Sequence, residues 1–199
     1  LCAKLSGGSV VVQNEASLQL QLASILKNLG ELFVFGVDER FAIELEKLVV
    51  NTEAAFAKSG SQRARVDIWY QFENRVSGDK VRTAIELKFF KKENHREPNN
   101  RYDAFGDILN LEGYGEHSDL GFLMIFTDHP HYVSHDKYSS NTGDFDLRHG
   151  SKYQTPMELQ YRTAVPHGPP IRLQNNYEFH WDTLDGGMFA LRLPVRTGS

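Results

Sequence analysis

Arg65-Val66-Asp67-Ile68-Trp69-Tyr70 and Ala84-Ile85-Glu86-Leu87-Lys88-Phe89-Phe90 are the two stretches that decide the fold of this chain. β-Branched and aromatic residues dominate both, so each stretch predicts a strand with at least one buried face. The polar segment 73–80 between them contains the Ser-Gly-Asp signal of a hairpin turn. Together the two stretches predict a pair of antiparallel strands.

The expected hairpin brings charged side chains together. If its turn is centred between Val76 and Ser77, Asp67 lies opposite Glu86. Lys88 points to the same face as Glu86, because side chains in a strand repeat every two residues. Charged groups among apolar neighbours are costly to desolvate unless they are paired or bind a cation. The patch therefore predicts a site for a hard divalent ion such as Mg²⁺, which accepts one or two carboxylates together with water and phosphate oxygens.

An Asp on one strand and Glu-x-Lys on the next resembles the signature of the PD-(D/E)xK nuclease superfamily. The matching residues are Asp67, Glu86 and Lys88, and Val66 stands where the name-giving pattern has Pro, a position that varies in the superfamily. The resemblance implies that Asp67, Glu86 and the backbone carbonyl of Leu87 hold Mg²⁺, for which Mn²⁺ would substitute. It also implies that Asp67, Glu86 and Lys88 are catalytic and that the substrate is DNA.

The elements expected around this hairpin follow the αβββαβ order of the superfamily core. The spacing of apolar residues predicts a helix over Gln13–Leu29, capped by Asn14 and stopped by Gly30. Further elements are predicted at 32–35 (strand), 41–46 (strand, although a helix also fits), 101–112 (helix) and 120–126 (buried strand). The resulting prediction is an α/β, restriction-endonuclease-like fold, with a mixed central sheet flanked by helices.

Three acidic positions near the expected site have two interpretations each. Glu15 falls on the inward stripe of the first helix, where it is either a first-turn acid favoured by the helix dipole or, as the resemblance implies, a further catalytic Glu that faces the metal. Glu44 and Glu46 share a face of the expected strand 41–46, and either lie near Asp67 or face solvent.

A polar, basic segment follows the Glu-x-Lys strand. It is either a solvated loop or a contact for the DNA backbone beside the metal. Its candidate DNA-binding residues are Lys91, Lys92, His95, Arg96 and Arg101. On the helix that follows, Asp103 and Asp107 are expected to face solvent or to fix neighbouring groups.

The last third of the chain departs from the minimal core. His129, His131 and His135 admit a zinc site, but no accompanying Cys or acid pattern supports it, so a polar loop is the preferred interpretation. The remaining segments are predicted to be a loop or short helix at 51–62, a flexible loop, lid or DNA-contacting insertion at 136–155, and strands at 157–163, 177–181 and 188–193. These predict a single domain over 1–199, with a core at about 10–135 and a β-rich extension at about 136–199.

Composition limits the class of protein. A chain of 199 residues, 40% hydrophobic and 24% charged, is of ordinary size and composition for one domain. The single cysteine, Cys2, excludes an internal disulfide and predicts a reducing, cytoplasmic setting. No apolar run approaches the ~18 residues of a membrane span. A net charge of −4 argues against a non-specific DNA coat but agrees with acids concentrated at a metal site.

The residues and the resemblance together predict an Mg²⁺-dependent DNA endonuclease of restriction or DNA-processing type that hydrolyses phosphodiester bonds. A homodimer would suit an enzyme that cuts both strands. One alternative is a catalytically silent, nuclease-like module for DNA binding or assembly. Another is a purely structural strand pair in which Lys88 bridges Glu86 and Asp67.

Overall fold

The computed structural model describes residues 1–50, 56 and 60–198. In chain order the elements are α1 (Cys2–Ser6), α2 (Glu15–Glu31), β1 (Glu39–Val50), β2 (Arg63–Asn74), β3 (Lys80–Phe90), the 3₁₀ helix η1 (Lys92–Asn94), α3 (Glu97–Glu112), β4 (Leu120–Thr127), α4 (His131–Ser134), β5 (Lys152–Tyr153), β6 (Tyr177–Glu178), β7 (Trp181–Leu184), the 3₁₀ helix η2 (Asp185–Gly187) and β8 (Met188–Val195).

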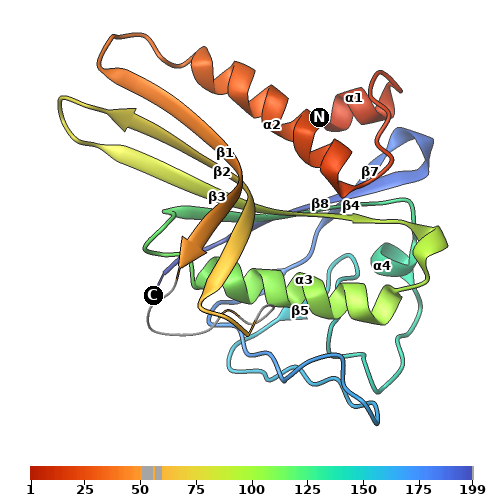
Figure 1. Cartoon of the computed structure of the whole chain (residues 1–199). Helices are drawn as coiled ribbons and strands as arrows, with labels where there is room; N and C mark the ends of the chain where they lie inside the picture. Colours follow the sequence, from red (N-terminus) through yellow and green to blue (C-terminus); the bar gives the residue numbers. More distant parts are fainter. Residues whose placement is uncertain (51–55, 57–59, 199) are drawn as a thin grey trace.

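A six-stranded mixed sheet runs through the molecule in the order β1-β2-β3-β4-β8-β7 (Figure 1). Strands β3 and β4 are parallel, joined by the crossover helix α3, and all other neighbours are antiparallel. Helix α2 covers one face and α3 the other (Figure 1). The predicted mixed α/β sheet flanked by helices is confirmed, as is the succession of helix, three strands, helix and strand.

Helix α2 begins as predicted and ends later. The Asn14 side chain accepts a hydrogen bond from the backbone N–H of Ser17 at 2.8 Å, and the Ser17 hydroxyl accepts one from the backbone N–H of Asn14 at 3.2 Å, which completes a capping box. Gly30 does not stop the helix, because α2 continues to Glu31. Gly30 instead lies against the Phe41 ring, to which a Cβ at this position would come within 2.5 Å.

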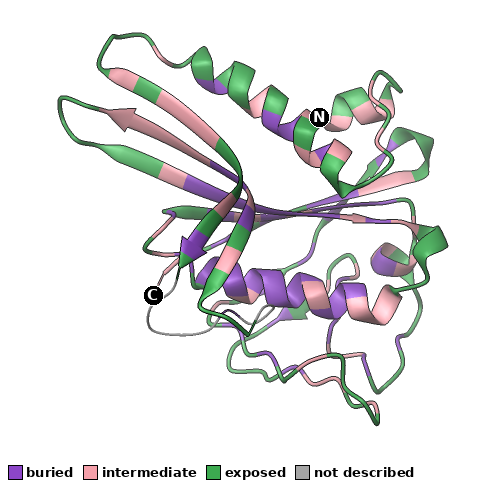
Figure 2. Ribbon diagram, viewed as in Figure 1, coloured by how far each residue is buried: buried purple, intermediate pink, exposed green. Residues whose placement is uncertain are grey.

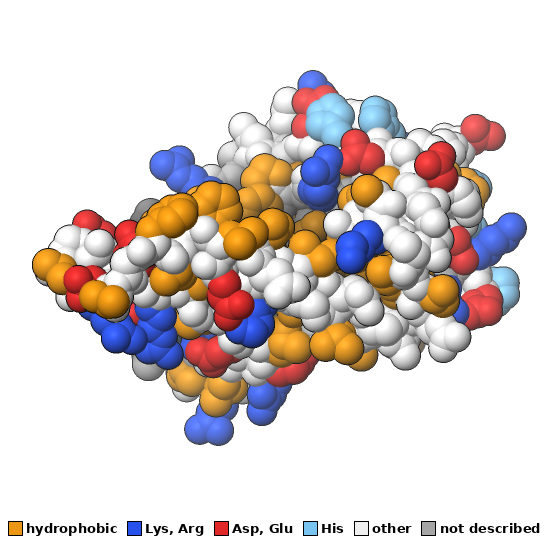
Figure 3. All heavy atoms as spheres, turned by 90° about the horizontal axis from the view of Figure 1, so that it is seen from above, with side chains coloured by type: hydrophobic (Ala, Val, Ile, Leu, Met, Phe, Trp, Pro, Cys, Tyr) orange, Lys and Arg blue, Asp and Glu red, His pale blue; other side chains and the backbone are white. Residues whose placement is uncertain are grey.

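The apolar run at 32–35 is not a strand, so that prediction is wrong. These residues form the turn between α2 and β1, and Phe35 is 83% exposed. Hydrophobic side chains also gather over the end of α2 and the adjoining strand tips (Figure 3, left). An apolar groove of about 410 Å³ lies there, lined by Leu26, Leu29, Gly30, Phe33, Phe41, Tyr70 and Phe72.

The β2–β3 hairpin has the predicted register. The ladder pairs Glu73 with Lys80 and Ile68 with Ile85, as a turn centred between Val76 and Ser77 requires. The segment 41–46 is a strand and not a helix, and belongs to β1. The β2–β3 ladder ends at Ile68 and Ile85, one pair short of the two acids, so the strands separate at Asp67.

Helix α3 is buried on nearly all sides (Figure 2). One face packs on the sheet, and the C-terminal third covers the other. Tyr102 on α3 donates a hydrogen bond to the carbonyl of Pro169. The buried carboxylate of Glu112 accepts from the backbone N–H groups of Gln174 and Asn175 and from the hydroxyl of Tyr177. The C-terminal third thus fixes the helix that underlies the sheet.

The C-terminal predictions are corrected in part. The segment 136–155 is not a flexible excursion, because Tyr138, Phe145 and Leu147 are buried in the core. The strand predicted at 157–163 is reduced to one bridge between Leu159 and Ile171. Strands β7 and β8 extend the main sheet, while β5 and β6 form a separate pair. Most of the predicted loop or short helix at 51–62 lies outside the described residues.

Within the described ranges, no helix is both long and apolar enough to cross a membrane.

Candidate functional site

Asp67 stands where the β2–β3 ladder ends and the β1–β2 ladder skips one pair. Glu46, its counterpart on β1, has a φ of 52° and is skipped in the β1–β2 pairing. The Asp67 carbonyl accepts a hydrogen bond at 2.6 Å from the Gln19 side chain on α2, which also donates to Glu46. On the other side, the Asp67 carboxylate accepts from the backbone N–H of Leu87 at 2.6 Å. Side chains therefore replace the missing ladder bonds and fix this carboxylate at the fork between β2 and β3.

Glu86 and Lys88 both point toward α3, as the two-residue period of β3 predicts. Glu86 is 3% exposed and accepts a hydrogen bond from the Tyr114 hydroxyl at 3.0 Å. Lys88 is 7% exposed, and its ammonium lies 3.0 Å from Asp107 on α3 and 3.9 Å from Asp67. The same ammonium donates to the Leu87 carbonyl at 2.9 Å. Asp67, Glu86 and Lys88 are thus gathered at one place by β2, β3 and α3.

Glu15 also reaches this place. Its carboxylate, in the first turn of α2, accepts from the backbone N–H of Phe89 at 3.3 Å, and Glu15 itself is exposed. Its charge contributes to the electrostatics of both Asp67 and Lys88. Glu15 is thus exposed and not on the inward stripe, although its carboxylate reaches the backbone of β3 beside the motif, and its catalytic role stays a prediction. Glu44, in contrast, pairs with Lys47 on β1.

The site concentrates negative charge around one ammonium. Burial raises the pKa of Asp67 to about 6; hydrogen bonding from Leu87 and the charge of Lys88 oppose this rise, and the charges of Asp107 and Glu15 add to it. Burial by itself would lower the pKa of Lys88, but Asp107, Asp67, Glu86 and Glu15 outweigh it and raise that pKa well above its ordinary value. Lys88 is therefore a fixed cation and a hydrogen-bond donor.

The donors fit a hard divalent ion that retains other ligands. No three His, Cys, Asp or Glu side chains are grouped to hold a metal ion within the described part of the chain. Two carboxylates, Asp67 and Glu86, and the Leu87 carbonyl are oxygen donors of the kind that Mg²⁺ takes, with water or phosphate completing its shell. The Leu87 carbonyl and the Asp67 carboxylate both lie within 4 Å of one point, the Lys88 nitrogen. These residues could hold Mg²⁺ only as a partly hydrated ion.

The candidate DNA-binding residues separate into two groups. Lys92, His95 and Arg96 are exposed in the segment after β3, and Lys91 pairs with Glu93 at 2.7 Å. Arg101 is 2% exposed, so the prediction that it contacts DNA is wrong.

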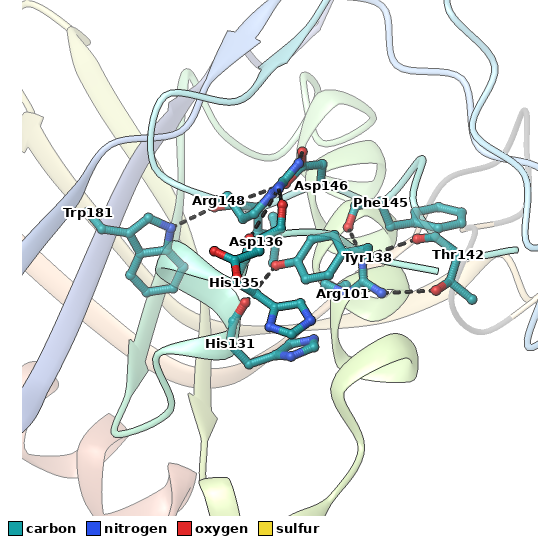
Figure 4. Close-up of polar contacts among 11 residues, drawn as sticks. Arg101, His131, His135, Asp136, Tyr138, Thr142, Phe145, Asp146, Arg148 and Trp181 are labelled. Carbon is teal, nitrogen blue, oxygen red and sulfur yellow. Dashed lines mark hydrogen bonds and ion pairs between the residues drawn. The ribbon is translucent and has the colours of Figure 1, made fainter. Parts of the chain in front are cut away.

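The buried Arg101 joins α3 to the segment that follows α4 (Figure 4). Its guanidinium donates to the carbonyls of Thr142 and Phe145 and to the Thr142 hydroxyl, and it stacks 3.6 Å from the centre of the Tyr138 ring. All of these partners belong to the C-terminal third, so the contacts of Arg101 are structural.

The three histidines lie close together near this cluster but are not placed as a zinc site. His129 pairs with Glu97 at 3.0 Å. The His131 ring packs against His135 and Tyr138 (Figure 4). Burial, aided by the charges of His135 and Arg101, lowers the pKa of His131 to about 4.

Sequence reasoning left the position of Asp107 open and missed two further residues of the site. Of the two alternatives for Asp107, exposure to solvent is wrong and the fixing of a neighbouring group agrees with the structure, because Asp107 is fully buried against Lys88. A signal for this was present, because Asp107 is three residues after Ala104 and four before Leu111, both on the buried stripe of α3. Tyr114 and Gln19 carry no such local signal, since their partners lie far away in sequence.

Comparisons of this chain with protein-family models, with curated proteins and with solved structures found no match.

Proposed function

We propose that this protein is a divalent-metal-dependent nuclease of the PD-(D/E)xK type that hydrolyses DNA phosphodiester bonds, built on the restriction-endonuclease-like variant of its mixed α/β sheet. The observation that supports this most is the clustering of Asp67, Glu86 and Lys88 at the fork between β2 and β3. The order of elements, α2-β1-β2-β3-α3-β4, adds to it. The excess of buried carboxylates over cations favours an additional cation.

Each residue has a chemical role in this proposal. Asp67, Glu86 and the Leu87 carbonyl would hold Mg²⁺, or Mn²⁺ in its place. The ion would polarise the scissile phosphate and lower the pKa of a bound water. Lys88, kept charged by the acids around it, would stabilise negative charge that develops on the phosphate. Glu15, exposed at the start of α2, would line the entrance to the site.

The DNA backbone would lie along the exposed segment after β3. Lys92, His95 and Arg96 are exposed there, directly beyond the strand that carries Glu86 and Lys88. Their contacts would position the backbone and carry no information on sequence. A homodimer, which would allow both strands to be cut, stays a prediction that sedimentation velocity would test.

The test is cleavage of supercoiled plasmid DNA with Mg²⁺ or Mn²⁺, compared with a chelator. Wild type is expected to nick or linearise the plasmid only with the ion. Asp67→Asn and Glu86→Gln should each lower the rate by about 100-fold or more, because each removes an ion ligand. Glu44→Gln, at an acid of β1 that pairs with Lys47, is the matched control and should cut like wild type. Full activity in both site variants would refute the proposal.

A second candidate is a catalytically silent module with the same fold. It is favoured by the pairing of Lys88 with Asp107, which gives the buried ammonium a partner without any ion. Such a module would retard DNA in a mobility-shift assay without cutting it, and Asp67→Asn would leave that binding unchanged.

A further inference from the structure

Lys88 lies among the atoms that would bind the ion. Its ammonium is 2.9 Å from the Leu87 carbonyl and 3.9 Å from the Asp67 carboxylate. A lysine ammonium has three donors and seeks the same oxygens as a divalent cation. Two like charges in one site also repel each other strongly where water is excluded. A divalent ion can bind here only if the ammonium is held to one side.

Asp107 provides that hold. Its carboxylate lies 3.0 Å from the Lys88 nitrogen, nearer than Asp67. It comes from α3, which packs between the sheet and the C-terminal third, whereas Asp67 and Leu87 come from the strands. Asp107 therefore holds the ammonium nearer to α3 than to the Asp67 carboxylate.

The environment of Asp107 makes this arrangement stable. The residue is 0% exposed, and Ala104 and Leu111 on the same stripe of α3 are equally buried. A buried carboxylate left without its cation is strongly destabilising, so the ion pair resists separation. Helix α3 is also fixed from its outer side by the contacts of Arg101, Tyr102 and Glu112.

We propose that Asp107 is a positioning residue for the candidate nuclease site, which anchors the Lys88 ammonium against α3 and so leaves the Asp67 carboxylate, 3.9 Å from that ammonium, available to a divalent ion. The inference rests on the proposed function in that it takes Asp67 to be an ion ligand. It assigns Asp107 no contact with the ion or the substrate.

The first test measures Mn²⁺ affinity, by calorimetry, in the full chain. Asp107→Asn keeps the shape of the side chain and removes its charge, so the ammonium should move toward Asp67 and weaken Mn²⁺ binding by about tenfold or more. In a Lys88→Met background, where no ammonium competes, the same change should weaken binding by less than about threefold. Asp103→Asn, one turn earlier on α3 where Asp103 pairs with His167, is the matched control and should bind like wild type.

The outcomes separate the inference from the proposed function. If Asp107→Asn binds Mn²⁺ like wild type, or weakens binding equally with Lys88 and with Met at position 88, the positioning role is refuted and the nuclease proposal stands. If wild type binds Mn²⁺ and shows the expected dependence on Asp107 but does not cut DNA, the nuclease proposal fails and the positioning role stands. If wild type binds no ion, both fail.

A second measurement needs no variant. Crystal structures of the wild-type protein with and without Mn²⁺ should both show the Lys88 Nζ within 4 Å of the Asp107 carboxylate. A longer separation when Mn²⁺ binds would overturn the inference, because the ammonium would then have left Asp107.

Discussion

The ionisation of Asp67 carries a free-energy cost that depends on pH. Its pKa in the folded protein is about 6, above the ordinary value of 3.8, so the folded state binds the proton more tightly than the unfolded state. Between pH 4 and 6 the wild type therefore loses stability, and above pH 6 the loss is complete. Asn at this position has no charge to bury and retains an oxygen that can accept from Leu87.

Asp67→Asn should accordingly stabilise the ion-free protein at pH 7 by about 2 kcal/mol and have little effect at pH 4. The measurement is urea unfolding in a chelator at both pH values. Asp146→Asn is a control of opposite sign: hydrogen bonds from Arg148 outweigh burial and hold the pKa of Asp146 below its ordinary value. That variant should lose stability at pH 7 and less at low pH. If the stability gained by Asp67→Asn became smaller as the pH rises, the prediction would be contradicted.

Two buried tyrosines offer a matched comparison. The hydroxyls of Tyr114 and Tyr177 donate to Glu86 and Glu112 at 3.0 and 2.7 Å respectively. Replacing either with Phe removes one hydrogen bond to a carboxylate, so each variant should lose about 1 to 3 kcal/mol in urea unfolding. Only Tyr114→Phe should weaken Mn²⁺ binding in calorimetry, since only Glu86 belongs to the candidate site. Equal Mn²⁺ affinity in the two variants would show that Tyr114 does not contribute to ion binding at the candidate site.

At the scale of elements, two helical glycines lie in opposite environments. A Cβ on Gly30 of α2 would come within 2.5 Å of the Phe41 ring on β1, while a Cβ on Gly106 of α3 would meet nothing within 4 Å. Alanine favours a helix over glycine by about 1 kcal/mol. At Gly30 the contact with β1 should therefore outweigh the gain in helix propensity from alanine. At Gly106 no contact opposes that gain.

Gly106→Ala should raise the free energy of unfolding by about 0.5 to 1 kcal/mol, because it gains helix propensity without a clash. Gly30→Ala should lower it by about 1 to 3 kcal/mol, because the Phe41 ring must shift from its position against Tyr70 and Phe72. Thermal unfolding of both variants measures the difference. A stabilised Gly30→Ala would mean that the Phe41 ring moves aside without loss of packing.

The elements that could be predicted from sequence are those that local rules determine. The Ser-Gly-Asp turn set the register of β2 and β3, and Asn14 set the start of α2. The run at 32–35 was misassigned because an apolar, β-prone segment forms a strand only when a neighbour pairs with it. The shared face of Glu86 and Lys88 followed from the two-residue period of β3. Their partners, Asp107 on α3 and Tyr114 just after it, depend on how that helix packs against the sheet.

At the scale of the whole molecule, Arg101 shows what local sequence rules do not predict. A basic residue beside a basic loop is ordinarily exposed, and only the C-terminal third, which closes over α3, buries this one. The same contacts join two parts of the chain that sequence reasoning separated at about residue 136. The sequence predicted a core and an appended extension. The structure shows in addition that the last third of the chain packs on α3 and so stabilises the core.

Arg101→Met should lower the free energy of unfolding by about 2 to 4 kcal/mol, because the carbonyls of Thr142 and Phe145 and the Thr142 hydroxyl lose their donor. Unfolding should remain a single transition in urea, since β8 pairs with β4 in the main sheet and binds the C-terminal third to the core. DNA affinity at a temperature where the variant is folded should equal that of wild type, in contrast to a Lys92→Met variant. Two separate unfolding transitions would show that the last third is an independent unit.

The left-handed residue in β1 has a consequence for solubility. Strand β1 is twelve residues long and forms one edge of the six-stranded sheet, which makes it a ready template for a strand of another molecule. Glu46, with its φ of 52°, interrupts the extended backbone near the end of this strand, and Glu44 and Lys47 place charges beside the interruption. A kinked and charged edge pairs poorly with a straight one. The distortion opposite Asp67 should therefore also disfavour edge-to-edge aggregation.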